Sequence, residues 1–242
     1  SAQKDLSMCS FRLFGLQKPK DKEVWSTEVT EKDLKNAIED EYGVKYSKDW
    51  KRLLRAPKNI GVYSIRKGVK VIGDSAFGWC DFLTSINIPN SVTTIGKSVF
   101  GWCNSLTSIN IPNSVTTIGD GAFWGCDSLT SITIPSSVVT IIGNPFFYWH
   151  GNLYNESKAF MYEDHVLFNK NKTTLIAYRA KETNYTIPNS VTTIGEGAFS
   201  NCNSLTSINI PNSVTTIGES AFWGCTSLTS INIPNNVTTI GN

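Results

Sequence analysis

Apolar residues recur along this chain with a fixed period of 23 positions. The repeated unit reads L-x-x-I-x-I-P-x-x-V-x-x-I-G-x-x-A/V-F-x-x-C. Phenylalanines mark the period at Phe77, Phe100, Phe123, Phe199 and Phe222. A cysteine follows each of them by three positions, at Cys80, Cys103, Cys126, Cys202 and Cys225. A sustained period of this length is typical of repeat proteins, in which each unit is one supersecondary element.

Each unit contains two short β-prone runs. Thr-Ser-Ile-Asn-Ile alternates polar and apolar residues, which is typical of a half-buried strand, and the proline after it ends that strand. Ser-Val-Thr-Thr-Ile-Gly is the second run, and its glycine suits a turn. The Ala-Phe-x-x-Cys segment is too short for more than one helical turn. One unit cannot bury its own apolar side, but stacked coils about 4.8 Å apart can. The pattern therefore predicts a mainly β solenoid.

The fourth unit departs from the pattern. Ser-Val-Val-Thr-Ile-Ile-Gly is interpreted as holding one extra residue, which would place Phe147 and His150 in the phenylalanine and cysteine columns. We expect an insertion from Leu153 to Asn184, before Tyr185-Thr-Ile-Pro rejoins the repeat, so that the inserted segment with this return covers residues 153–188. Inside it, residues 166–178 predict a hairpin that turns near Lys170 and Asn171.

The same hairpin module occurs earlier in the chain. A shift of 122 residues aligns Val44 with Val166, and Tyr46 with Phe168. Residues 44–65 are therefore expected to form a hairpin coil that opens a first array. Before it, Thr30 can cap a helix over about residues 30–42 that ends at Gly43 and covers the open end of the stack. The expected domains are an N-terminal segment (1–43) and a solenoid (44–242), with arrays at 66–152 and 189–242.

These repeats resemble the BspA-like leucine-rich repeats found in surface proteins of bacteria and some protozoa. The match is carried by I-x-I-P-x-x-V-x-x-I-G-x-x-A-F-x-x-C at residues 86–103, 109–126 and 208–225. The resemblance covers roughly residues 44–242 and implies a right-handed leucine-rich-repeat superhelix. It also implies a role in adhesion, including binding of host matrix proteins, without fixing a ligand.

Composition and charge exclude some classes of partner. The net charge is +2, only 17% of residues are charged, and no run of Lys or Arg is present. Nucleic acid is therefore not an expected partner. No stretch approaches the length of apolar sequence that spans a membrane. The opening Ser1-Ala2 resembles an expression remnant, so a leader peptide is not expected to be visible.

Neither catalysis nor a metal site is expected. The sequence has no nucleophile elbow, zinc-protease motif or phosphate-binding loop, and its two histidines, His150 and His165, have no evident catalytic partner. Parallel cysteines from successive coils cannot converge tetrahedrally on zinc. We interpret them as small buried hydrophobes. Cys9 lies outside the repeats and is interpreted as a free thiol. No cofactor is expected.

The outward strand positions and the tryptophans are the candidate ligand surface. Alternation places a ladder of Ser and Asn residues opposite the core. Tryptophans occupy variable slots beside the repeated phenylalanine, where they can contact protein or stack on sugars. The candidates are Ser85, Asn87, Ser108, Asn110, Ser207, Asn209, Ser230, Asn232, Trp79, Trp102, Trp124 and Trp223. The alternative is structural: the ladder side chains hydrogen-bond to one another, and the tryptophans only close the edge of the core.

We therefore expect a non-catalytic binding or adhesion module of a secreted or cell-surface bacterial protein. Its expected partner is a protein, such as a host matrix protein, bound through an extended repeat surface. Two alternatives remain open, namely a glycan-binding module that uses the tryptophans and a structural spacer without a ligand. The sequence leaves the oligomeric state open.

Overall fold

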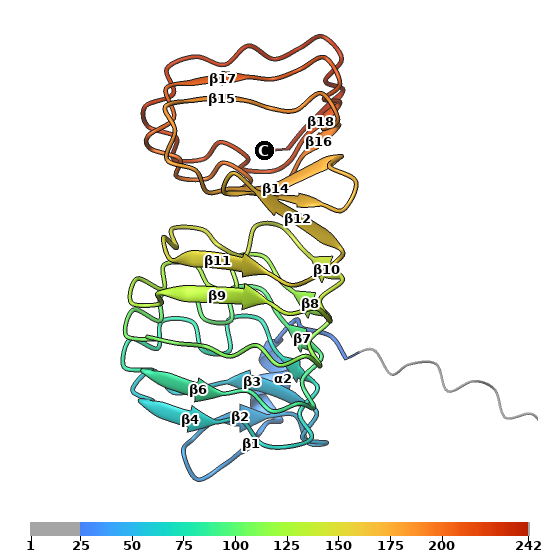
Figure 1. The fold of residues 1–242 in the computed structure, drawn as a ribbon. Coiled ribbons are helices and arrows are strands. Elements are labelled where there is room, and N and C mark those ends of the chain that lie inside the picture. Colours follow the sequence, from blue (N-terminus) through green and yellow to red (C-terminus); the bar gives the residue numbers. More distant parts are fainter. Residues whose placement is uncertain (1–24, 242) are drawn as a thin grey trace, which may run out of the picture.

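The computed structural model describes residues 25–241, which form a stack of coils built mostly from short strands (Figure 1). Two sheets run along one side of the stack. The first has seven strands in the order β1-β2-β3-β5-β7-β8-β10, and the second has six in the order β12-β13-β14-β16-β18-β19. Three two-stranded sheets, β4-β6, β9-β11 and β15-β17, lie along another side. The predicted β solenoid is confirmed.

The elements have the following bounds. The first array and the segment before it hold α2 (Glu31–Lys35), β1 (Ile38–Glu39), β2 (Lys45–Tyr46), β3 (Arg52–Arg55), β4 (Val62–Ser64), β5 (Val71–Ile72), β6 (Ser85–Asn87), β7 (Thr94–Ile95), β8 (Thr117–Ile118), β9 (Ser131–Ile134), β10 (Thr140–Ile141) and β11 (Asn152–Asn155). The rest of the chain holds β12 (Phe160–Glu163), β13 (Val166–Asn169), β14 (Thr174–Tyr178), β15 (Asn184–Thr186), β16 (Thr193–Ile194), β17 (Ser207–Asn209), β18 (Thr216–Ile217) and β19 (Thr239–Ile240).

Parallel pairing of equivalent residues produces the core. Thr94 and Ile95 of β7 pair with Thr117 and Ile118 of β8, and the same register recurs between successive coils. Identical residues therefore stack at the spacing of neighbouring strands. The repeated Leu, Ile, Val and Phe positions are buried from coil to coil, and burial of this apolar surface stabilises the stack.

The phenylalanine column corrects the interpretation of the fourth unit. Phe146, not Phe147, continues the column, because its ring stacks on Phe123 with centroids 6.2 Å apart and planes 10° apart. Trp149 is buried at the position of the cysteine, whereas His150 is exposed. Thr140 and Ile141 of β10 pair with Thr117 and Ile118, so the period of 23 continues without an extra residue. Ile142 stands where the other units have glycine.

Both hairpin modules are present, and each has three strands rather than two. β2 pairs with β3 in antiparallel fashion, as β13 pairs with β14, and each pair joins the following array through a parallel contact. The additional strands are β1 and β12, which pair with β2 and β13. Residues 152–155 form β11, which pairs in parallel with β9. The chain thus remains in the first stack until Asn155.

The expected helix over residues 30–42 is wrong in length and position. The helix α2 ends at Lys35, and β1 begins at Ile38. Thr30 does cap it, since its side chain accepts from the backbone N–H of Asp33 while the Asp33 side chain accepts from that of Thr30. Tyr42 is exposed rather than packed on a helix face. The helix lies beside β3, and the edge strand of the sheet is β1.

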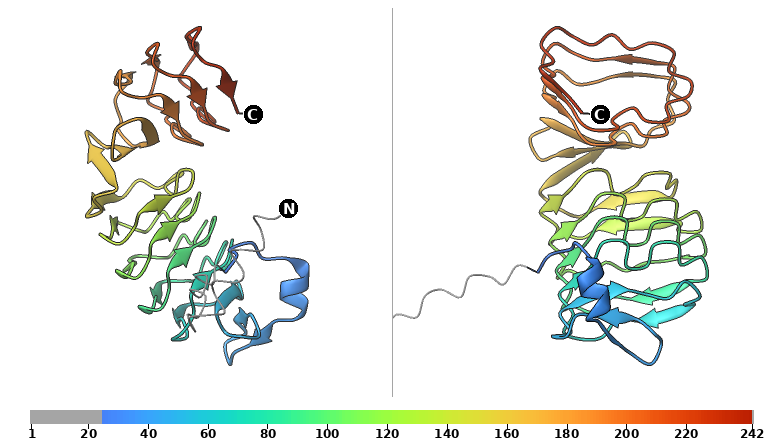
Figure 2. Two further views of the ribbon diagram at one scale, coloured as in Figure 1. Left: turned by 90° about the vertical axis from the view of Figure 1, so that its right-hand side faces the viewer. Right: turned by 180° about the vertical axis from the view of Figure 1, so that it is seen from behind.

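The hairpin of β12 and β13 interrupts the stack. It adds two strands on the side of the long sheets, whereas nothing joins β11 to β15 on the other side. The stack bends at this place, so the chain forms an arc with the insertion at its bend (Figure 2). Across the bend, Asn144 and Phe147 of the first array contact Gly197 of the second.

Candidate functional site

The Ser and Asn ladder is exposed, but only part of it lies on strands. Ser85 and Asn87 are on β6, and Ser207 and Asn209 are on β17. Ser108, Asn110, Ser230 and Asn232 are also exposed, but they lie outside strands. Among the described residues, no hydrogen bond joins these ladder side chains to one another. The bonds along the ladder come instead from a neighbouring threonine, as when Thr206 Oγ1 donates to the carbonyl of Thr183 at 2.9 Å.

The tryptophans form a continuous row of aromatic rings. Trp79 stacks on Trp102 with centroids 5.2 Å apart, and Trp102 lies 5.5 Å from Trp124. Tyr148 then links the two arrays, because it lies 6.2 Å from Trp102 and 6.1 Å from Trp223. Trp79 is 58% exposed and Trp223 is 56% exposed. We call these five residues the aromatic row.

Three aromatic residues that stand two positions after a phenylalanine of the column have backbones in the left-handed region. We call this position of the repeat the second aromatic slot. The slot contains Trp79 (φ 63°), Trp102 (φ 59°) and Tyr148 (φ 51°) in the first array. Other coils place glycine or asparagine in this slot, at Gly125, Asn201 and Gly224, also with positive φ. Glycine and asparagine tolerate this conformation, whereas a bulky residue there costs on the order of 1 kcal/mol. Where glycine fills the slot, the tryptophan stands one position earlier, as Trp124 and Trp223.

A charged cluster lies beside the aromatic row where the arrays meet. Lys97 Nζ pairs with Asp120 Oδ2 at 3.3 Å. Lys97 and Asp120 line a cavity of about 280 Å³. Glu196 and Glu219, from the second array, line this cavity as well, together with Trp124, Phe147 and Trp223. Burial raises the pKa of Glu196, and the neighbouring Asp120 raises it further. Phe147 packs directly against Gly197, so a side chain at that glycine would collide with its ring.

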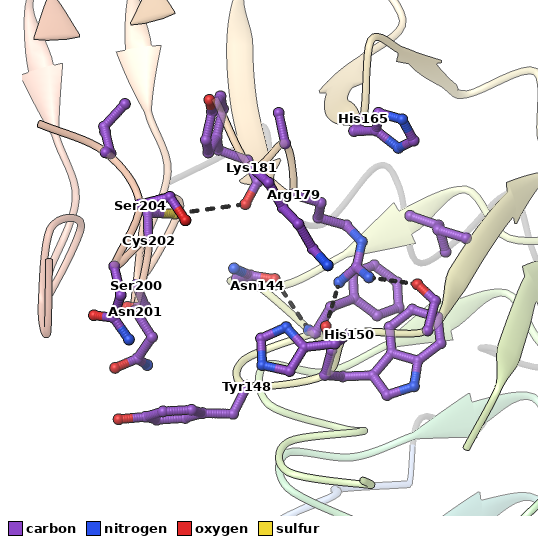
Figure 3. Close-up of a pocket in the computed structure, with 18 of the residues that line it drawn as sticks. Asn144, Tyr148, His150, His165, Arg179, Lys181, Ser200, Asn201, Cys202 and Ser204 are labelled. Atoms are coloured by element: carbon purple, nitrogen blue, oxygen red, sulfur yellow. Dashed lines mark hydrogen bonds between the residues drawn. The ribbon is translucent and has the colours of Figure 1, made fainter. Parts of the chain in front are cut away.

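A larger cavity of about 870 Å³ opens between β11 and the chain that leads into β15 (Figure 3). Arg179 spans its base, because Nη1 donates to the carbonyl of Trp149 at 3.0 Å and Nη2 donates to that of Gly151 at 2.8 Å. Burial lowers the pKa of Arg179. Asn144 Nδ2 also crosses between the arrays and donates to the carbonyl of Gly197 at 2.9 Å.

The repeated cysteines are free thiols within the core. Cys103 Sγ donates to the carbonyl of Phe77 at 3.2 Å, and Cys126 Sγ donates to that of Phe100 at 3.0 Å. Cys202 and Cys225 are half-buried. Within residues 25–241, no group of three or more His, Cys, Asp or Glu side chains could hold a metal ion. Cys9 lies outside the described residues.

Sequence reasoning missed the residues that connect the arrays. Tyr148 shares its slot with Trp79 and Trp102, but the supposed extra residue in the fourth unit hid this equivalence. Correct counting of the period would have revealed it. Arg179 and Phe147 gave no comparable signal, because their contacts depend on how the inserted hairpin bends the stack.

The sequence of the chain matches a known family of repeats. Residues 58–159 and 176–242 match the family described as BspA type leucine rich repeat region, in six copies. The chain belongs to this family. No curated protein matches the chain in sequence. Within residues 25–241, no helix is long and apolar enough to cross a membrane.

Solved bacterial structures share the fold. A leucine-rich repeat protein from Eubacterium ventriosum is 32% identical over 75% of this chain and 56% of its own, with a TM-score of 0.61. A leucine-rich cell surface protein from Faecalibacterium prausnitzii is 30% identical over 75% of this chain and 62% of its own (TM-score 0.55). The pneumococcal vaccine antigen PcpA is 26% identical over 83% of this chain and 54% of its own, with a TM-score of 0.61. The chain thus spans little more than half the length of these proteins.

Proposed function

We propose that this chain is a protein-binding module of a bacterial surface or secreted protein, and that the aromatic row is its main contact surface. The row carries the proposal because it is continuous across both arrays and partly exposed. Tryptophan and tyrosine dominate the buried centres of protein interfaces. Leucine-rich repeat proteins of this kind are typically non-catalytic scaffolds, which agrees with the expected absence of catalysis.

The backbone of the row supports the same proposal. Trp79 and Trp102 occupy a slot that glycine or asparagine fills at lower cost. The Trp79 side chain contributes little to the core, since it is 58% exposed. Strained, exposed aromatic residues are more readily explained by contact with a partner than by the stability of the stack.

The partner class is tested with purified proteins. We expect saturable binding to at least one member of a panel of purified host extracellular matrix proteins in a surface plasmon resonance screen. Trp79→Ala and Trp223→Ala should each weaken that binding by tenfold or more, which corresponds to about 1.4 kcal/mol. The matched control is Asn87→Ala with Asn209→Ala, which changes the ladder and leaves the aromatic row intact.

Each outcome of this experiment distinguishes the alternatives. A loss of binding in the ladder variant alone would move the contact surface to the Ser and Asn residues. The absence of saturable binding to every protein in the screen would favour the structural spacer.

Glycan binding by the same row is the second candidate function. It is favoured by the exposed indole of Trp79, which continues the stacked pair at the end of the row. Indole rings stack on the apolar faces of sugars. Tryptophan fluorescence titrated with neutral oligosaccharides tests it, and a change lost in Trp79→Ala would support it. Unchanged emission up to millimolar sugar would dismiss this candidate.

A further inference from the structure

The cavity between the arrays is a consequence of the inserted hairpin. β12 and β13 add two strands on one side of the stack, and the other side has no matching strands. β11 pairs only with β9, and β15 pairs only with β17 within the described chain. The coils therefore separate at this place, and the parallel pairing between successive coils stops on this side of the stack. The resulting space of about 870 Å³ is within the usual size range of small-ligand sites.

Aromatic side chains line this cavity. Tyr148, Trp149, Tyr154 and Tyr162 all contribute to its walls, and Tyr154 is 56% exposed. Such rings offer flat apolar faces with a polar edge. Ser200, Asn201, Cys202 and Ser204 lie along the opposite wall from His150 and Arg179 (Figure 3). The cavity therefore combines ring faces on one wall with short polar side chains on the other.

Positive charge outnumbers negative charge among the lining residues. Arg179 and Lys181 line the cavity, and Glu182 is the single acidic residue among the lining residues. Both histidines of the chain also line it. Neither cation forms a salt bridge with a carboxylate within residues 25–241. A bound anion would supply the charge partner that these side chains lack.

Buried polar atoms without partners point to the same kind of ligand. Tyr178 lines the cavity and is only 4% exposed, yet its hydroxyl has no hydrogen-bond partner within the described chain. Arg179 Nε and Asn201 Nδ2 are also buried and unpartnered. Buried polar groups are normally hydrogen-bonded, so these three atoms leave the wall of the cavity short of partners.

We propose that this cavity is a second binding site, which meets the aromatic row only at Tyr148, and that it binds an acidic saccharide with a carboxylate on its ring. Tyr154 and Tyr162 stack on the sugar ring, Lys181 neutralises the carboxylate, and short polar side chains of the opposite wall, such as Ser204, hydrogen-bond to sugar oxygens. A cavity of this size encloses one or two sugar rings rather than the face of a folded protein. The site thus differs in shape and chemistry from the aromatic row.

Saturation-transfer NMR and calorimetry test the proposal on the whole chain. The probes are 3′-sialyllactose and trigalacturonic acid, with lactose as the matched neutral sugar and triglutamate as an acidic peptide. We expect both acidic sugars to bind, and lactose and triglutamate to bind at least tenfold more weakly. Lys181→Gln and Tyr154→Ser should each reduce sugar affinity by about fivefold or more, because each removes one exposed contact from the wall.

The controls separate this site from other surfaces. Lys170→Gln removes an exposed charge at the hairpin turn, outside the cavity, and should bind as the parent chain does. Tyr42→Ser removes an exposed aromatic ring outside both the cavity and the aromatic row, and should also leave sugar binding unchanged. Far-ultraviolet circular dichroism confirms that each variant is folded.

Three results would overturn the proposal. The first is that neither acidic sugar binds at concentrations up to about 10 mM. The second is that triglutamate binds as tightly as the sugars, which would reduce the cavity to a general anion site. The third is that sugar binding is the same in the Lys181→Gln and Tyr154→Ser variants as in the parent. None of these results bears on protein binding by the aromatic row.

Discussion

The type of side chain at a buried position of this solenoid depends on the column of stacked residues to which the position belongs. Cys80, Cys103 and Cys126 each fill a small apolar position behind a phenylalanine, with the thiol directed at a backbone carbonyl of an earlier coil. Their repetition arises from packing, because each coil presents the same small space. Metal and disulfide chemistry are not needed to explain it.

The buried thiols should be chemically inert in the folded protein. Burial raises the pKa of Cys80 to about 11 and that of Cys126 to about 12, so both remain protonated at pH 8. Iodoacetamide at pH 8 should therefore modify Cys80, Cys103 and Cys126 far more slowly than the half-buried Cys225. Peptide mass spectrometry checks this. In 6 M guanidinium chloride all of these thiols should react, and rapid labelling of native Cys103 would contradict the packing.

Most columns were predictable from the repeat, and the exceptions have physical causes. The periodic Leu, Ile, Val and Phe positions are buried as the pattern indicates. Phe146 was misassigned because two phenylalanines are adjacent, and an isoleucine at the glycine position imitated an insertion. Strand register distinguishes the two phenylalanines, because the ring that stacks on Phe123 must lie 23 positions later.

At the scale of elements, the hairpin modules determine where an array begins. In both modules, the last strand of an antiparallel hairpin pairs in parallel with the first strand of the following array. Sequence similarity identified two strands of each module. β1 escaped notice because it has only two residues and lies within residues 30–42, where a helix was expected. The pairing of β1 with β2 outweighs the helical tendency of this segment, so α2 remains short.

Arg179 should hold the two arrays together. It donates to the carbonyls of Trp149 and Gly151, and its guanidinium lies 4.4 Å from the Trp149 ring. Arg179→Lys cannot reproduce the paired geometry and should destabilise the chain by about 2 kcal/mol. Urea denaturation measures the loss, and hydrogen exchange should become faster around Trp149–Asn152.

A second arginine provides the control. Arg66 stacks on Trp50 near the other end of the first array, at 4.1 Å. Arg66→Lys should leave hydrogen exchange around Trp149–Asn152 unchanged. Equal effects of the two variants would show that Arg179 has no special role between the arrays.

At the scale of the whole molecule, carboxylates from both arrays come together at the bend. The pKa of Glu196 is raised by burial and by Asp120, so the folded state binds this proton more tightly than the unfolded chain does. The stability that this carboxyl contributes is present below its unfolded pKa and is lost as the pH rises through the folded value. At neutral pH its negative charge therefore opposes the contact between the arrays.

Glu196→Gln should raise the melting temperature at pH 7 by about 1–2 °C. The difference should disappear near pH 3, where Glu196 is protonated in both the folded and the unfolded chain. Thermal unfolding at the two pH values measures it. Glu41→Gln, at an exposed position outside this cluster, serves as the control and should shift the melting temperature little at either pH. A gain for Glu196→Gln that is the same at both pH values would exclude the electrostatic cause.

The aromatic row and the cavity were predictable to different degrees. The tryptophans are visible in the sequence as occupants of variable slots, and their neighbours follow from the period. The cavity depends on two strands inserted on one side only. Its lining combines residues from distant parts of the chain, such as Tyr148, Tyr162 and Asn201. No local pattern brings these together, because the bend that does so is a property of the stack.

The uniform register of the coils also determines how this protein can change in length. Leu83–Gly96, Leu106–Gly119 and Leu205–Gly218 are identical in sequence, and their Thr-Ile strands β7, β8 and β18 pair in parallel in the same register. Gain or loss of one whole coil within an array, as by unequal recombination between the matching gene segments, would leave every strand pairing of the remaining coils intact. The two arrays can therefore be lengthened or shortened independently, while the bend and its cavity are inherited as one unit.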